Sequence, residues 1–289
     1  MKKKILLITL VFIGALFLTG CKQDNMEDIN IIVTNYPNEY ITKKLYGSHA
    51  TIKSVYPDGV DISNYNISKK QKLDFSKNDL FIYNGKIEKE NNLAFDLLDL
   101  NQNLKIIDTA YVLETDYAPE ELWLNPSSLL MMAQNIRLGL EEYSTSTYLK
   151  KDIDASYEKL KISLSELDAD YRVAVENTNN KTVLVANSTF KYLEKFGLRV
   201  ICVDSDASDK TISDAQNLIN KGNVSYIYSF KGEKLSENAQ KLLDNNPSNL
   251  KKLELNKLDN ISDSDRNNKK TYISIMNENL ELLKQELYQ

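Results

Sequence analysis

The sequence predicts an α/β protein with two lobes, each with a roughly four-stranded parallel sheet and flanking helices, joined by one long connecting α-helix. Short β-rich runs alternate with helical stretches along the chain, which is the pattern of α/β folds. The runs are mostly continuous apolar segments, as expected for strands that helices cover on both faces. Four such runs stand on each side of a central helical segment, so the pattern occurs twice.

The N-terminal segment has the layout of a secretory signal. Lysines at positions 2–4 precede an apolar run at 5–18. At about 14 residues, this run is short for a stable membrane span, which needs about 20. It ends in LTGC at 18–21, which resembles the lipobox of bacterial lipoproteins, in which the cysteine becomes the lipidated first residue. An ordinary signal with a chance cysteine is the alternative.

We therefore expect a lipoprotein signal peptide at residues 1–20 and a polar tether at 21–28. Stable anchoring takes more than one acyl chain, and bacterial lipoproteins generally carry several on this cysteine. Lipidation of Cys21, by palmitate or a similar chain, would anchor the protein to the outer face of the bacterial cytoplasmic membrane.

Eight strands are expected, four in each lobe. In the first lobe they are 29–34, 51–56, 80–83 and 104–108, and in the second 182–186, 199–203, 224–228 and 253–255.

The central segment predicts a long helix, because apolar residues recur every three or four positions and no Gly or Pro occurs from 140 to 196. The apolar residues are Ile153, Tyr157, Leu160, Leu164, Leu167, Tyr171 and Ala174. A helix of about 30 residues is about 45 Å long. An exposed coiled coil is the alternative.

We expect this linking helix within 146–180, the N-terminal lobe at 29–145 and the C-terminal lobe at 181–289. A helical connector resists hinge opening, so no large clamshell motion is expected.

Other helices are located by their end signals. Asn125 is a capping residue and Pro126 suits the first helical position, with an apolar stripe following at 129, 132, 136 and 140. Gly197 ends a helix that begins near Ser188, and the segment 270–288 is amphipathic.

Composition excludes several classes of function. The chain has 36 basic and 41 acidic residues, and its net charge of −5 becomes more negative without the three leading lysines. Nucleic-acid binding, which needs a basic face, is therefore not expected. The sequence has one histidine, no phosphate-binding loop, no GxSxG and no CxxC, so an enzyme is not expected. Cys202 is read as a buried strand residue without a reactive role.

Ligands of open α/β sheets bind beyond the carboxyl ends of the strands. Four loops follow strands in this way and carry polar residues: those with Ser63, residues 114–121, Asn187 and Asn256. Two belong to each lobe, so their convergence would form a site between the lobes. Plain polar loops are the alternative.

The chain resembles the metal-binding (zinc and manganese) solute-binding lipoproteins of bacterial ABC importers over nearly all of its mature length. The segments that carry the resemblance are NYP (35–37), PDGVDISNY (57–65), DLFIYNG (79–85), ELWLNP (121–126), NSTFKYLEKFGL (187–198) and TYISIMNENLELL (271–283). They correspond in order to family patterns that include GxDPHxY, HxWLDP and HxAFxYLAxxYGL.

The resemblance implies a metal held by three imidazoles and a carboxylate or a close variant. Matched residue by residue, the histidines fall on Ser63, Glu121 and Asn187, and the acidic ligand on Asn256. None of these four cleft positions carries the family's ligand. Since serine and asparagine offer only weak neutral oxygens, nanomolar zinc binding through this set is not expected, and no metal is assigned with confidence.

Other residues are weaker candidates for cation binding. Glu114, Asp116, Glu120 and Glu121 form an acidic cluster that could favour calcium or manganese, against the reading that they are solvated loop acids. His49 lies at the strand end opposite the cleft and reads as a surface loop residue. Asp61 is expected to cap its loop through hydrogen bonds.

The resemblance implies an extracytoplasmic substrate-binding lipoprotein of an ABC importer of the zinc and manganese uptake family, with a degenerate metal site. Its partners would be a permease and its ATPase, and it would act as a monomer. The alternatives are a non-transporting surface or cell-adhesion lipoprotein on the same scaffold, or a binder of a small polar ligand or hard cation.

Overall fold

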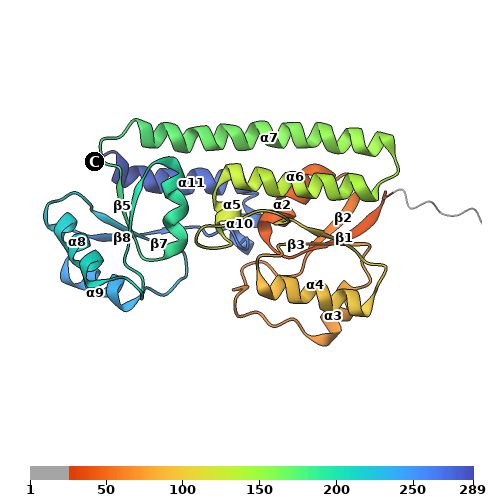
Figure 1. The fold of residues 1–289 in the computed structure, drawn as a ribbon, viewed down its shortest axis with the longest axis horizontal. Helices are drawn as coiled ribbons and strands as arrows, with labels where there is room; N and C mark the ends of the chain where they lie inside the picture. The colour runs from red at the N-terminus through yellow and green to blue at the C-terminus, as the bar shows by residue number, and fades with distance from the viewer. Residues whose placement is uncertain (1–25) are drawn as a thin grey trace, which may run out of the picture.

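A computed structural model describes residues 26–289, so the expected signal peptide and Cys21 lie outside the described residues. Two four-stranded parallel sheets lie side by side (Figure 1). The first contains β1 (Ile29–Val33), β2 (Ala50–Ser54), β3 (Leu80–Tyr83) and β4 (Lys105–Asp108). The second contains β5 (Thr182–Val185), β6 (Arg199–Cys202), β7 (Tyr226–Phe230) and β8 (Lys251–Leu255).

The two sheets have the same strand order. The first runs β2-β1-β3-β4 and the second β6-β5-β7-β8, with every neighbouring pair parallel. Strand order therefore reverses beside β1 in the first sheet and beside β5 in the second. Such reversal points open a crevice at the carboxyl ends of the strands, where ligands of α/β proteins bind.

Helices cover both faces of each sheet. Between β1 and β5 along the chain, the helices are α2 (Tyr36–Tyr46), α3 (Lys69–Phe75), α4 (Glu88–Leu100), α5 (Glu121–Leu124), α6 (Pro126–Tyr143) and α7 (Thr147–Glu176). After β5 along the chain, they are the 3₁₀ helix η1 (Ser188–Phe196), α8 (Asp209–Asn220), α9 (Glu237–Asn245), α10 (Asp263–Asn267) and α11 (Tyr272–Leu287).

The strands agree closely with the sequence prediction. All eight expected runs are strands, and their observed ends differ from the expected ones by at most two residues. The runs are recognisable because parallel strands buried on both faces need uninterrupted apolar side chains. The edge strands β2 and β8 depart from this pattern: the residues of β2 alternate between half-buried and exposed, and three of the five residues of β8 are exposed.

The helices expected from their end signals are confirmed. Asn125 caps α6 by accepting a hydrogen bond from the Ser127 N–H at 2.9 Å, with Pro126 at the first helical position. Gly197 ends η1 with φ of 94°, a left-handed conformation that favours glycine. The linking helix α7 has 30 residues, and all seven residues of its predicted apolar stripe are buried.

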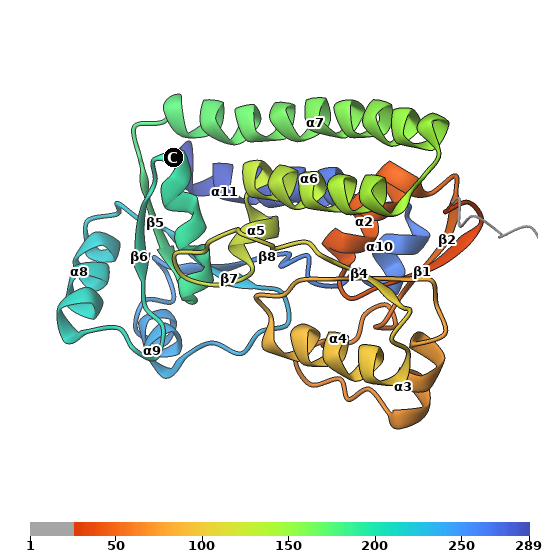
Figure 2. The ribbon, with the colours of Figure 1, turned by 45° about the vertical axis from the view of Figure 1, so that its right-hand side comes forward.

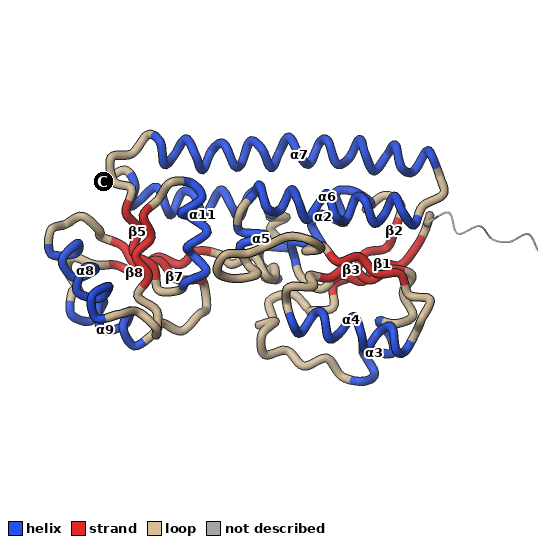
Figure 3. The backbone as a smooth tube through the Cα atoms, in the orientation of Figure 1, coloured by secondary structure: helices blue, strands red, loops and turns tan. Residues whose placement is uncertain are grey.

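The largest hydrophobic core is shared by the two lobes. One continuous cluster joins residues of both sheets with the inner faces of α2, α6, α7 and α11, and Leu164 of α7 lies within it. Figures 2 and 3 show the same layering, with α7 running along both lobes above α6 and α11. Two smaller cores lie on the opposite faces of the sheets, one beneath α4 and the other beneath α8 and α9.

Within residues 26–289, no helix combines the length and apolar character that a membrane crossing requires.

Candidate functional site

The Ser63 loop (residues 57–65) follows β2 and faces the second lobe. Asp61 organises it: one carboxylate oxygen accepts from the Ser63 N–H at 2.9 Å and the Ser63 hydroxyl at 2.6 Å, and the other accepts from Asn64 at 2.6 Å. These hydrogen bonds, that from the Ser63 hydroxyl foremost, lower the pKa of Asp61. The expected capping role of Asp61 is confirmed, and the exposed Ser63 hydroxyl is directed to its own loop.

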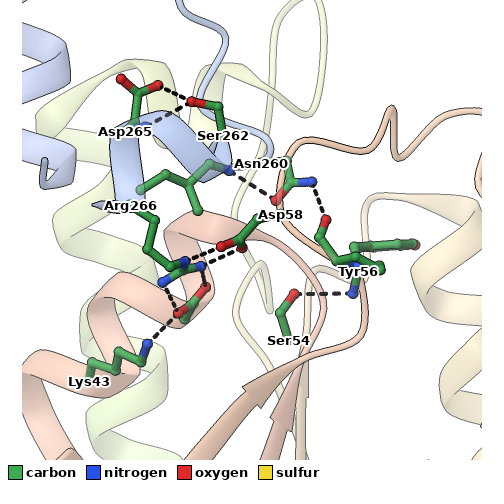
Figure 4. A network of polar contacts seen from close by, with 11 residues as sticks. Lys43, Ser54, Tyr56, Asp58, Asn260, Ser262, Asp265 and Arg266 are labelled. Carbon is green, nitrogen blue, oxygen red and sulfur yellow. Dashed lines mark hydrogen bonds and ion pairs between the residues drawn. The ribbon is translucent and has the colours of Figure 1, made fainter. Parts of the chain in front are cut away.

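A crossing segment (residues 256–267) runs from the end of β8 to the first lobe and holds the Ser63 loop. The Gly59 N–H donates to the Ile261 carbonyl at 2.8 Å, and the Asn260 side chain donates to the carbonyls of Pro57 and Val60 at 2.8 and 3.0 Å. Arg266 of α10 reaches back to Asp58, as Figure 4 shows. The loop is thus held by chain from the other end of the sequence.

Arg266 binds two carboxylates of the first lobe. Its guanidinium contacts Asp58 through two nitrogens and donates to both Glu39 oxygens, at 2.8 and 2.9 Å. The hydrogen bonds that it donates to Asp58, and then those to Glu39, raise the pKa of Arg266. Bidentate guanidinium–carboxylate pairs are among the stronger polar contacts in proteins.

Glu121 is buried at the start of α5, with 1% of its side chain exposed. Its carboxylate accepts from the backbone N–H groups of Tyr117 and Ala118, the latter at 2.7 Å, and lies 3.4 Å from the Lys195 ammonium of η1. All these partners compete with any cation for the carboxylate oxygens. Glu121 therefore shapes the 116–118 turn and connects the lobes through Lys195.

Asn187 lies where strand order reverses in the second sheet, directly after β5. Its side-chain oxygen caps η1 by accepting from the Thr189 N–H at 2.8 Å. Its amide nitrogen donates to Glu233 at 3.0 Å. Glu233 follows β7, the neighbouring strand, so the pair stands at the crevice that the strand order creates.

Asn256 begins the crossing segment. Its side-chain oxygen accepts from the Leu258 N–H at 2.8 Å, while its backbone N–H and carbonyl bond the Asn279 side chain of α11, both at 2.8 Å. Leu258 has φ of 62°, a conformation that non-glycine residues adopt infrequently. Asn256 thus fixes the chain reversal that presents the next residue, Lys257, to the cleft.

Lys257 forms the central ion pairs of the cleft. Its ammonium lies 3.2 Å from Glu120, which precedes α5, and 3.1 Å from Glu233. Its carbonyl accepts from the Trp123 indole at 2.8 Å. Burial works to lower the pKa of Lys257, but Glu120, Glu233 and Asp259 together outweigh it and raise that pKa. The ammonium charge is therefore retained.

Ser63 and Asn256 line one cavity of about 650 Å³. Its walls combine the Ser63 loop of the first lobe with residues after β7 and the crossing segment, including Lys231, Glu233 and Lys257. Asn187 and Glu121 are outside the lining. Asn187 adjoins it through its hydrogen bond to Glu233, whereas Glu121 is one residue removed from Glu120, which itself reaches the cavity only through its ion pair with Lys257.

The residues present do not fit a metal ion. In the part of the chain that the structure describes, no three His, Cys, Asp or Glu side chains are grouped closely enough to hold one. Three of the acids of the 114–121 cluster are already paired with lysines: Asp116 and Glu121 lie 3.6 and 3.4 Å from Lys195, and Glu120 lies 3.2 Å from Lys257. Glu114 is exposed.

The two remaining candidates, His49 and Cys202, do not line the cleft cavity. His49 precedes β2, and its ring nitrogen lies 2.6 Å from Asp152 of α7. His49 lies in the turn before β2, as expected, but its side chain is only 15% exposed, so it is a partly buried loop residue rather than a solvated one. Cys202 is buried at the end of β6, as predicted, and burial raises the pKa of its thiol to about 12.

Sequence reasoning missed Lys257 and Glu233. Glu233 had a usable signal, because it follows strand β7 just as Asn187 follows β5, and the loop after this strand belongs to the same sheet edge. Lys257 had none, since a lysine after a strand has the same appearance in sequence whether it is solvated or paired.

Comparisons with known proteins agree with this architecture. The sequence profile of a family described as "Zinc-uptake complex component A periplasmic" matches residues 31–286. The chain belongs to this family. The resemblance noted in the sequence is therefore confirmed at the level of the family.

Two relatives illustrate the similarity. The "Zinc-binding lipoprotein AdcA" of Streptococcus pneumoniae is 26% identical over 315 residues, which cover 98% of this chain and 61% of the relative. The chain thus spans about three fifths of the length of the relatives of this kind. A "Metal ABC transporter substrate-binding lipoprotein" of Lactococcus lactis is 29% identical over 218 residues, covering 67% of this chain and 68% of the relative.

Solved structures share the fold. The Zn(II)-bound ZnuA-like domain of Streptococcus pneumoniae AdcA superposes with a TM-score of 0.72 at 23% identity, covering 91% of this chain and 100% of that domain. The laminin-binding protein Lmb of Streptococcus agalactiae, titled a bifunctional protein with adhesin and metal transporting activity, gives 0.72 at 20% identity, covering 90% and 99%. The expected fold of two parallel four-stranded sheets with flanking helices is confirmed.

Proposed function

We propose that the chain is the extracytoplasmic solute-binding component of an ABC importer and that its cleft takes a small polar organic solute. The observation that carries the proposal is the cavity of about 650 Å³ between the Ser63 loop and the loops of the second sheet. Its volume falls within the range of small-molecule sites. Family membership and the names of the relatives support the importer role.

The mechanism is reversible capture without covalent chemistry. Ser63 and Asn256 line the cavity on opposite lobes, while Asn187 and Glu121 hold its surroundings in place. Side chains of both charge signs, such as Lys231 and Asp259, line the same cavity and suit a solute that carries donors and acceptors. The loaded monomer would then dock onto a permease that an ATPase drives.

The location follows from the same proposal. Lipidation of Cys21 would anchor the protein to the outer face of the bacterial cytoplasmic membrane. The expected tether at 21–28 is shorter than the sequence suggested, because Met26 is buried in the core and the Asp28 N–H donates to the His49 carbonyl. The residues between Cys21 and Met26 would let lobes 29–145 and 181–289, with their linking helix, reach the permease. The lipoprotein names of the relatives support this placement.

The test is a thermal-shift and calorimetric titration of the lipid-free protein. The probes are amino acids, short peptides, polyols and sugars, alongside ZnCl₂, MnCl₂ and CaCl₂. We expect one organic class to raise the melting midpoint, and Asn256→Ala to weaken that response more than Lys221→Ala on the far side of the second lobe.

Deletion of the chain from cells should lower uptake of the same solute. Silence to every probe, with unchanged uptake, would contradict the proposal in favour of a non-transporting surface protein. Stoichiometric binding of calcium or manganese alone would favour a hard-cation binder.

A further inference from the structure

The Lys257 ammonium lies between carboxylates of the two lobes. Glu120 is reached from the first sheet through the loop after β4, while Glu233 follows β7 of the second sheet, and the ammonium lies 3.2 and 3.1 Å from them. A cation bound between these two carboxylates would occupy the same position. Here a side chain of the protein supplies the positive charge.

The ammonium is held in place from several directions. The chain reversal at Asn256 and Leu258 fixes the backbone on both sides of Lys257, and the Trp123 indole bonds the Lys257 carbonyl. The second carboxylate oxygen of Glu233 is occupied by the Asn187 amide at 3.0 Å. Only 24% of the Lys257 side chain is exposed, so its charge acts in a partly desolvated setting.

The charges explain why a divalent cation is a poor occupant. Glu120 and Glu233 are already ion-paired with Lys257, and the charge of Asp259 also acts on it, so these three acids already stabilise a cation. A metal ion would have to displace the ammonium or bind beside it. At a separation of a few ångströms, repulsion between unit charges weakens binding by about 10-fold or more.

We propose that Lys257 is the specificity determinant of the cleft: its ammonium replaces the divalent cargo, excludes metal ions and joins the two lobes without any cargo. This inference concerns what the cleft excludes, and it holds whether or not the chain serves an importer. Loss of the metal ligands would by itself also weaken metal binding. The proposal differs from that explanation, because it assigns the exclusion of metal ions to the positive charge of Lys257, which a single substitution removes.

Lys257→Met tests the proposal, since methionine has a similar shape and no charge. Calorimetry and thermal shift with MnCl₂, CaCl₂ and ZnCl₂ should detect cation binding to the variant that is about 10-fold or more tighter than to the wild type. Lys234→Met is the matched control, because Lys234 lines the same cavity from an exposed position. Lys257→Arg, which keeps the charge, should exclude cations as the wild type does.

A second variant keeps the test decisive if Lys257→Met is unstable. Lys257→Met/Glu233→Gln removes the pair together, so it leaves less uncompensated charge and should fold. If Lys257→Met folds only with added MnCl₂, the proposal is supported.

Three results would overturn the proposal. The first is equal cation affinity in Lys257→Met and Lys234→Met. The second is nanomolar zinc binding by the wild type at this cleft. The third is a Lys257→Met variant that folds neither alone nor with MnCl₂ while the double variant folds.

Discussion

Glu90 is a carboxyl group fully enclosed beneath the carboxyl ends of β1 and β3. It accepts hydrogen bonds from the Thr34 hydroxyl, from the Asn35 amide at 3.0 Å and from the Asn84 N–H at 2.7 Å. Burial is the main cause that raises the pKa of Glu90, to about 7, against hydrogen bonds that lower it. The protonated form is thus favoured in the folded protein relative to the unfolded chain.

This shift makes stability depend on pH in a definite direction. The stabilising effect of the bound proton is complete below the ordinary value of 4.5 and is lost as pH rises through about 7. We expect Glu90→Gln to remove this part of the dependence, which amounts to at most about 3 kcal/mol. Urea unfolding of wild type and variant at pH 5 and pH 8 measures it, and parallel pH profiles would show that Glu90 does not titrate in this range.

The buried carboxylate of Glu121 gives a second prediction at this scale. Glu121→Ala leaves the N–H groups of the 116–118 turn without their acceptor and removes the buried one of the two carboxylates that pair with Lys195. We expect the free energy of unfolding to fall by about 1–3 kcal/mol. Glu114→Ala, at an exposed position of the same acidic cluster, should change it by less than about 0.5 kcal/mol. Equal effects would mean that Glu121 is solvated.

Sequence reasoning identified these side chains unequally. Asp61 was predictable because an aspartate in a Pro-Asp-Gly-containing loop bonds nearby backbone groups. Glu121 was recognised as a cleft position. Its role as the hydrogen-bond acceptor of the 116–118 turn and as the partner of Lys195 was not predicted, because both depend on how the loop folds. The burial of Glu90 could not be predicted from the sequence, since a glutamate in the first turn of a helix is ordinarily exposed.

At the scale of elements, the crossing segment connects parts of the chain that sequence analysis treated separately. The strands and helices were predictable because apolar runs, caps and breakers act locally, as with Asn125 and Pro126 at the start of α6. The short helix α10 was not, because its five residues carry no apolar stripe and its place is fixed by Arg266 binding Glu39 and Asp58.

Arg266→Ala should loosen the Ser63 loop more than it unfolds the protein. Because the Arg266 side chain is 36% exposed, solvent screens its ion pairs, and we expect a loss of roughly 1–2 kcal/mol. Amide hydrogen exchange at Gly59, whose N–H bonds the Ile261 carbonyl, should become faster. The control is Arg172→Ala, which breaks an exposed pair with Asp168 on α7. Unchanged exchange at Gly59 would contradict this role for Arg266.

At the scale of the whole molecule, the shared core makes the two lobes energetically dependent on each other. The sequence suggested two domains from its length, but the largest hydrophobic cluster runs through α7 and touches both sheets. Neither the length of the chain nor the apolar stripe of α7 reveals this shared core, because the stripe predicts burial without indicating which sheet buries it.

We expect thermal unfolding in one cooperative transition, with equal calorimetric and van't Hoff enthalpies. Leu164→Ala, in the middle of the shared core, should destabilise both lobes together by about 2–5 kcal/mol. Ile162→Ala, exposed on the same helix, serves as control. Two separate transitions, or hydrogen exchange that rises in only one lobe of Leu164→Ala, would show that the lobes unfold independently.

The crossing segment also sets an order of events during synthesis. The Ser63 loop is complete once residue 65 has left the ribosome, but the groups that fix it, from Asp259 to Arg266, emerge only after about 200 further residues. N-terminal segments generally begin to fold while synthesis continues. The mouth of the first lobe therefore stays unfinished until these residues have emerged, and a nascent chain stalled before residue 259 would keep this loop accessible to chaperones and proteases.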